Sequence, residues 1–113
     1  MTIRDLTAKT IIASRVEVAD TPFRRMKGLL GRTSLPQESA LIITQCNSIH
    51  MFFMKFPIDA VFVDRRGIVV GMVKNIRPFR LSPVFLRSDR VIELPAGTID
   101  KTKVSLGDLV ETG

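Results

Sequence analysis

The sequence is poor in the residues that usually carry catalysis, metal binding or disulfides. Its 113 residues include one cysteine and one histidine, but no tryptophan and no tyrosine. A single cysteine excludes an internal disulfide and favours a reducing compartment, so we expect a cytoplasmic protein. A zinc site needs three or four Cys, His or carboxylate ligands, and we therefore predict no metal and no other cofactor.

Long apolar runs are also missing. No segment approaches the roughly 20 consecutive apolar residues of a membrane span. The first ten residues carry charges at positions 4, 5 and 9 instead of the apolar stretch of a secretion signal. The length is the commonest one for a single domain, and no linker or repeat divides the chain. We predict one domain over residues 1–113 that does not span a membrane.

Basic residues exceed acidic ones by seventeen to eleven, which gives a net charge of +6. The excess is uneven: residues 65–90 hold seven basic residues and one acid, Asp89. A second basic cluster lies at 24–32 and contains no acid. Such clusters favour anionic partners, for example nucleic acid or an acidic protein. The solvated surface of a small soluble domain explains the same pattern, so both interpretations stay open.

One short helix is predicted near residues 21–30. Thr21 can cap its first turn, and proline is favoured directly after the cap. Phe23, Met26 and Leu30 follow at helical spacing, so we expect them to form a buried apolar face. Gly31 is the expected end of the helix.

The other apolar segments are short and separated by turn residues, which indicates β-strands. The predicted strand segments are 13–18, 41–43, 51–56, 60–63, 68–73, 90–94 and 105–110. Asp64–Gly67 fits a hairpin turn. Residues 77–89 contain two prolines and predict a long loop, in which we expect Phe79 to be tucked into the core. The fold class is therefore mainly β, a compact sandwich or barrel-like domain with one short helix.

Cys46 and His50 are the candidate catalytic pair, because a thiol beside an imidazole can act as a nucleophile. Positions four apart on a strand lie ~13 Å from each other, too far to bond. Only a tight loop would join them. We favour a buried free thiol and a structural histidine, and keep a thiol-dependent enzyme as an alternative.

Lys55 and Asp59 form a second group of candidates. Lys55 interrupts an apolar segment, where it would either bind an anion or pair with Asp59 or Glu93. We favour the ion pair, because such pairs at edges are common. Asp59 follows Pro57. If it neither binds a ligand nor pairs with Lys55, we expect its carboxylate to cap backbone N–H groups.

Four motifs occur in order along the chain. They are Arg25-Met-Lys-Gly-Leu-Leu-Gly-Arg32, His50-Met-Phe-Phe-Met-Lys-Phe-Pro-Ile-Asp59, Val61-Phe-Val-Asp64 with Gly67, and Glu93-Leu-Pro-Ala-Gly97 with Gly107-Asp108. Together they resemble the family called domain of unknown function 192. The resemblance implies a compact, mainly β sandwich-like fold and no assigned catalytic residue. It also implies that the polar motif positions fall on Arg32, Lys55, Asp59, Glu93 and Asp108.

The charged motif residues suggest a function because they stand in otherwise apolar segments. We predict a small, non-enzymatic module that binds a polar or anionic ligand through Arg32, Lys55, Asp59 and Glu93. Binding of nucleic acid or an acidic protein through residues 65–90 is the first alternative. A thiol-dependent enzyme that uses Cys46 and His50 is the second. The oligomeric state stays open.

Overall fold

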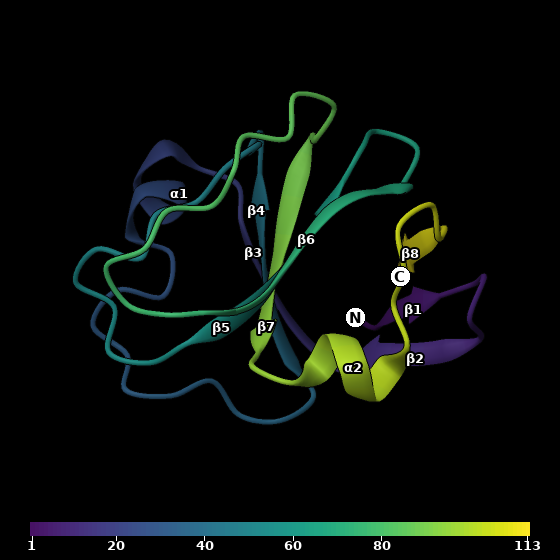
Figure 1. Cartoon of the computed structure of the whole chain (residues 1–113), viewed down its shortest axis with the longest axis horizontal. Helices are drawn as coiled ribbons and strands as arrows, with labels where there is room; N and C mark the ends of the chain where they lie inside the picture. Colours follow the sequence, from purple (N-terminus) through teal and green to yellow (C-terminus); the bar gives the residue numbers. More distant parts are fainter.

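The computed structural model describes residues 1–113 and contains two β-sheets and two short helices (Figure 1). In chain order the elements are β1 (Ile3–Asp5), β2 (Thr10–Ala13), β3 (Arg15–Ala19), α1 (Pro22–Lys27), β4 (Ser39–Thr44), β5 (Ile58–Val63), β6 (Val69–Ile76), β7 (Arg90–Pro95), α2 (Thr98–Thr102) and β8 (Val110–Thr112). The predicted mainly β fold is confirmed, and so is the helix within 21–30. Neither helix is long or apolar enough to cross a membrane.

The larger sheet has five strands in the order β3-β4-β7-β5-β6. Its pairs are antiparallel except for β3 and β4, which run parallel and are joined by the crossover that contains α1. All six residues of β5 are buried, because both faces of the sheet are covered. The predicted β5–β6 hairpin is confirmed: the Asp64 carboxylate accepts hydrogen bonds from the backbone N–H groups of Arg66 and Ile68, both at 2.9 Å.

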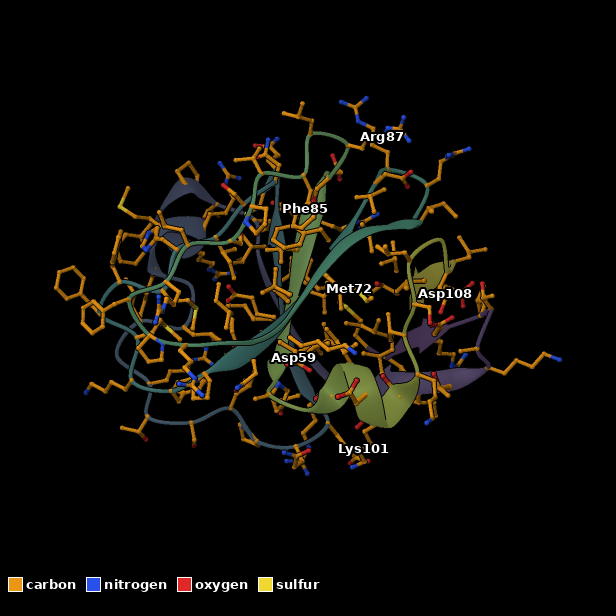
Figure 2. The ribbon with its side chains drawn as sticks, viewed as in Figure 1. Asp59, Met72, Phe85, Arg87, Lys101 and Asp108 are labelled. Carbon is orange, nitrogen blue, oxygen red and sulfur yellow. The ribbon has the colours of Figure 1, made fainter.

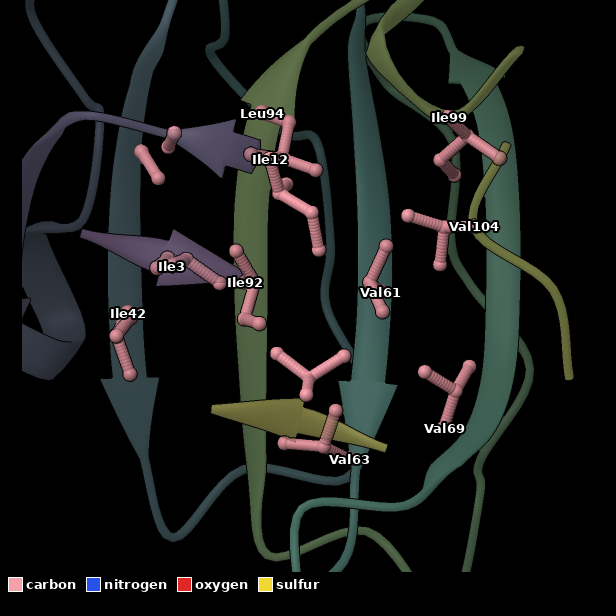
Figure 3. Close-up of a cluster of buried hydrophobic side chains, with 13 residues drawn as sticks. Ile3, Ile12, Ile42, Val61, Val63, Val69, Ile92, Leu94, Ile99 and Val104 are labelled. Atoms are coloured by element: carbon pink, nitrogen blue, oxygen red, sulfur yellow. The ribbon is translucent and has the colours of Figure 1, made fainter. Parts of the chain in front are cut away.

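The first face of this sheet is covered by the three-stranded sheet, ordered β2-β1-β8, and by α2. Ile3 and Ile12 of the smaller sheet pack against side chains such as Val61 and Ile92 of the larger one (Figure 3). Val110 of β8 belongs to the same cluster. All five side chains are at least nine-tenths buried. This face is therefore a regular sandwich core.

The second face is covered by α1 and by long loops. Its core centres on Phe62, which is fully buried and lies against Phe85 with the ring centroids 4.6 Å apart. Phe85 belongs to the predicted 77–89 loop and packs directly on Gly71 of β6. A Cβ atom at Gly71 would come within 2.3 Å of the Phe85 ring, so only glycine leaves room for it. Loop side chains, not a second sheet, close this face.

The helix differs from its prediction in two ways. It ends at Lys27, with Gly28 as its C-cap, and it buries none of its residues. Phe23 and Met26 are 75% and 78% exposed, so the expected buried apolar face is wrong. A helix of six residues is fixed here by the Thr21 cap and by its connections. Its spacing pattern was too short to reveal which side faces the core.

The segment 51–56 was expected to be a strand and is a loop. The backbone N–H of Met51 donates to the carbonyl of Arg80 at 2.8 Å, and its carbonyl accepts from Phe79 at 2.7 Å. Phe53 then takes a left-handed φ of 64°, which breaks the extended conformation. Strands β1 and β2 and helix α2 were not predicted, because their few polar and apolar residues form no clear pattern.

Candidate functional site

A cavity of about 110 Å³ lies on the second face of the five-stranded sheet, between α1 and the segment 46–54. Its walls are mostly apolar and include Ile43, Met51 and Met54. Its polar lining includes Glu93, which comes from the middle of β7. Glu93 is the only acidic residue of the lining and its most buried polar residue.

Strand alternation explains why Glu93 faces this cavity. Val91 of β7 belongs to the core of the second face, and Glu93 follows two positions later on the same side. Across the strand pair, Glu93 stands opposite Ala60, whose small side chain leaves space beside the carboxyl group. Above it lies Gly28, where a Cβ atom would be 4.0 Å from Oε1. Two small residues thus keep the carboxyl group uncovered.

Glu93 has no hydrogen-bond or ion-pair partner in the protein, although it is only 6% exposed. Burial raises its pKa from 4.5 to about 7, because the loss of water disfavours the charged form. Near neutral pH the carboxyl group is therefore present in both forms. It can accept hydrogen bonds as a carboxylate and donate one as a carboxylic acid.

Cys46 lines the same cavity. Its thiol donates to the carbonyl of Ser48 at 3.0 Å. Burial raises the pKa of the thiol, and the negative charge of Glu93 raises it further. A thiol of this kind stays protonated at neutral pH, unlike the thiolate of a cysteine nucleophile.

His50 lies at the mouth of the cavity and is exposed. Its ring stacks on Phe52, with the centroids 5.4 Å apart, and makes no hydrogen bond with Cys46. Strand β4 ends at Thr44, so Cys46 and His50 lie in a loop and the strand distance of ~13 Å does not apply to them. For this reason the two residues can border one cavity. The cations Arg25 and Lys27 of α1 also line the cavity.

Asp59 lies on the other face of the sheet, beside α2 (Figure 2). Its carboxylate accepts three backbone hydrogen bonds, from Asn75 at 2.8 Å, Gly97 at 3.1 Å and Ile99 at 2.9 Å. These bonds hold the end of β6 and the start of α2 against β5. The carboxylate caps backbone groups and does not face the Glu93 cavity.

The other predicted site residues are dispersed. Arg32 pairs with Glu17 at 2.6 Å on the surface. Lys55 is exposed and has no ion-pair partner, so the expected pair with Asp59 or Glu93 is wrong. The reason is the loop at 51–56, which points Lys55 to water. Of the four proposed ligand-binding residues, Glu93 alone lines the cavity.

Part of the positive charge of the basic segment 65–90 is paired with acids. Three of its cations are in ion pairs, Arg65 with Asp89, Arg66 with Asp64, and Lys74 with Asp100. Phe79, expected in the core, is 61% exposed. No three or more His, Cys, Asp or Glu side chains gather closely enough to hold a metal ion.

Sequence reasoning missed Arg25, Lys27 and Gly28 as cavity residues. Their motif looked like a simple helix end. One signal was available in the sequence: Glu93 stands between the apolar residues Ile92 and Leu94 of a strand. A buried glutamate at such a position needs a small neighbour that leaves it uncovered, and Gly28 is that neighbour.

The fold and cavity define a small β-sandwich domain with a buried carboxyl group in the lining of a cavity. The chain belongs to the DUF192 family, described as "Uncharacterized ACR, COG1430", whose profile matches residues 4–112.

Similar proteins come from archaea and bacteria. A UPF0127 protein of Thermococcus sibiricus is 37% identical over 101 residues, which cover 86% of this chain and 65% of the relative. One from Pyrococcus abyssi is 36% identical and covers 86% of this chain and 85% of its own. The chain thus spans just under two thirds of the Thermococcus relative.

Solved structures share the fold. A protein of unknown function from Novosphingobium aromaticivorans has a TM-score of 0.84 at 25% identity, covering 98% of this chain and 82% of its own. A protein from Sinorhizobium meliloti, described as a proposed transcription regulator, has a TM-score of 0.81 at 23% identity. The match covers 97% of this chain and 89% of the Sinorhizobium chain. The family has no established activity.

Proposed function

We propose that this domain binds a small polar ligand in the cavity above Glu93. The observation that carries the proposal is a carboxyl group that is 94% buried, has no partner in the protein and borders a cavity. Burial disfavours the charged form of this carboxyl group. A ligand that donates hydrogen bonds to Glu93 would favour the carboxylate.

The size of the cavity limits the ligand. Its volume of about 110 Å³ is somewhat smaller than the roughly 150 Å³ of an engineered cavity that holds benzene. We therefore expect a ligand, or the buried part of one, with about six non-hydrogen atoms or fewer. Sugars and nucleotides are too large to enter completely.

The chemistry of the walls limits it further. Glu93 favours a hydroxyl, amide or amine group at the deep end. The apolar side chains of Ile43, Met51 and Met54 favour a short hydrocarbon part in the middle. Arg25, Lys27 and His50 at the mouth favour a polar or anionic group at the outer end. A small amino acid or hydroxy acid has these three parts.

The test is a ¹H–¹⁵N NMR titration with small amines, alcohols, amides, amino acids and hydroxy acids. We expect a member of the panel to shift the amide signals of residues 26–30 and 46–51. The Glu93→Met variant, which keeps the volume but removes both oxygens, should lose at least tenfold in affinity. Asp100→Asn, an exposed acid away from the cavity, should bind as the wild type does.

The outer end of the ligand has its own matched pair of variants. Arg25 lines the cavity and Arg24, its neighbour in α1, does not. Arg25→Gln should weaken the binding of acids more than that of alcohols, and Arg24→Gln should leave both unchanged. If no compound in the panel binds at millimolar concentration, or if Glu93→Met binds equally well, the proposal is wrong.

The alternative of a thiol-dependent enzyme makes a different prediction. An activated Cys46 would react with iodoacetamide at pH 7 faster than free cysteine does, since its thiolate fraction would be larger. We expect slow labelling, because burial raises the pKa of the Cys46 thiol. Labelling at the rate of free cysteine or above would favour the enzyme over the binding module.

A further inference from the structure

We propose that one end of the molecule docks on anionic lipid membranes. This basic end consists of residues 21–28, 46–58 and 77–82. These three segments contain six of the seventeen Lys and Arg residues and none of the eleven acids. The remainder of the chain has eleven basic and eleven acidic residues, so the whole net charge of +6 is carried by the basic end.

The three segments lie together although they are distant in sequence. Segment 46–58 and α1 form opposite walls of the Glu93 cavity. Segment 77–82 is held to segment 46–58 by backbone hydrogen bonds of Met51 with Arg80 and Phe79, and of Ile49 with Ser82. In Figure 1 they form the left end of the long axis, away from both termini. The positive charge is therefore concentrated in space as well as in sequence.

The same end exposes large apolar side chains. Phe53 is 76% exposed, Phe79 61% and Leu81 66%, and Phe23 and Met26 of α1 are exposed to a similar degree. Four of the seven phenylalanines of the chain lie exposed in these segments. Apolar side chains interleaved with lysine and arginine are typical of surfaces that insert into the boundary between lipid head groups and acyl chains.

The backbone at the two loop tips supports this interpretation. Phe53 and Phe79 have φ angles of 64° and 65°, a left-handed conformation that is uncommon for a bulky residue. Their rings meet edge to face, with the centroids 6.1 Å apart. Strained residues that persist without burying their side chains point to a use outside the fold. Here both rings are exposed.

A membrane explains these features better than a second copy of the chain, a nucleic acid or another protein does. A second copy of the chain would bring two surfaces of charge +6 together, which repel each other. Single-stranded nucleic acid stacks on open ring faces along a groove, whereas the exposed rings pack against each other and alternate with Met26 and Leu81. A protein partner would bury about 800 Å² on each side in a standard interface, whereas the large exposed apolar side chains here are the few on the two loops and on α1. Apolar tips at one end of an elongated molecule match a lipid surface.

Cosedimentation of the chain 1–113 with vesicles tests the proposal. At 0.1 M salt we expect binding to vesicles of phosphatidylcholine with 30% phosphatidylserine and little binding to phosphatidylcholine alone. The Lys55→Gln/Arg77→Gln double variant should lower the affinity about 25-fold, since each cation near such a surface contributes about fivefold. The control Lys101→Gln/Lys103→Gln removes the same charge elsewhere and should change binding less than threefold.

Insertion is measured separately by fluorescence. The chain has no tryptophan, so Phe53→Trp introduces a single reporter. Its emission should shift to the blue with anionic vesicles, while that of Leu86→Trp, exposed outside the basic end, should not. The proposal is overturned if the chain does not sediment with these vesicles at 0.05 M salt. It is also overturned if the double variant binds as well as its control, or if only a single-stranded oligonucleotide binds.

Discussion

The two faces of the five-stranded sheet each bury a carboxyl group, but only one of these groups has partners. Asp59 on the first face accepts three backbone hydrogen bonds. Glu93 on the second face accepts none, and burial raises its pKa to about 7. The residues stand one register position apart, because Asp59 is opposite Leu94 and Ala60 is opposite Glu93.

The comparison separates two uses of a buried acid. On the first face β6 and the start of α2 bring backbone donors to the carboxylate, which therefore stabilises the fold. On the second face the cover consists of α1 and loops, and they leave a cavity where donors would be needed. Asp59 and Glu93 belong to two different family motifs, of which one thus supplies a structural position and the other a candidate ligand position.

The largest expected effect comes from Asp59. Asp59→Ala leaves three N–H groups without their acceptor, and hydrogen bonds to a charged group are worth about 1.5–3 kcal/mol each. We expect the free energy of unfolding to fall by about 5 kcal/mol, measured by urea denaturation. The control Asp100→Ala removes an exposed acid and should change it by less than about 1 kcal/mol. A small loss for Asp59→Ala would abolish the distinction between the two acids.

Glu93 should affect stability through pH. Its pKa is about 7 in the folded chain and 4.5 as the ordinary value. The folded state therefore holds the proton more tightly, and stability falls as the pH rises from about 4.5 to 7. At 1.36 kcal/mol per pKa unit the loss approaches about 3 kcal/mol. Urea unfolding between pH 4.5 and 8 measures it.

Glu93→Gln is the control for this pH dependence. His50, Cys46, Arg25 and Lys27 also line the cavity, and the variant retains all four. The difference between wild type and Glu93→Gln across this pH range therefore isolates the carboxyl group. Parallel curves for the two proteins would show that Glu93 is solvated or has a partner, contrary to the structure.

Gly71 tests the loop cover of the second face. A Cβ atom there would overlap the Phe85 ring, so Gly71→Ala should displace the ring or shift β6. Overpacking of this kind lowers the free energy of unfolding by about 1–3 kcal/mol. Gly71→Ala combined with Phe85→Ala should be less damaging than the sum of the two single variants. Additive losses would mean that Phe85 does not depend on Gly71.

The smallest effect is a gain in stability. Phe53→Gly and Phe79→Gly relieve a left-handed backbone without removing buried contacts, because both rings are exposed. Each should raise the melting temperature by a few degrees, equivalent to about 1 kcal/mol. Phe62→Gly, at a buried position of β5, should instead unfold the protein. A loss of stability in the loop variants would indicate that the rings pack more firmly than their exposure indicates.

Much of the fold was predictable, because alternation, turn residues and the family motifs mark β3 to β7 and the hairpin at Asp64. The short strands β1 and β2 were not, since three or four residues carry too little pattern. Of the candidate residues named from the sequence, Glu93, Cys46 and His50 line the cavity. Lys55 and Asp59 follow each other closely in sequence, but a loop turns Lys55 to water and the strand turns Asp59 to the opposite face. Whether a side chain faces water or one side of the sheet depends on tertiary contacts, and the spacing of residues in the sequence does not reveal these contacts.

The pairing of β1 with β8 has a consequence for the order of folding. Thr2 and Gly113 exchange two backbone hydrogen bonds beside the pairing of β1 with β8. During synthesis, β8 is made about a hundred residues after β1, so the smaller sheet cannot be completed before β8 is made. Joining residues 1 and 113 by a short linker and opening the chain at the Asp64–Gly67 turn would remove this delay while keeping every strand pair.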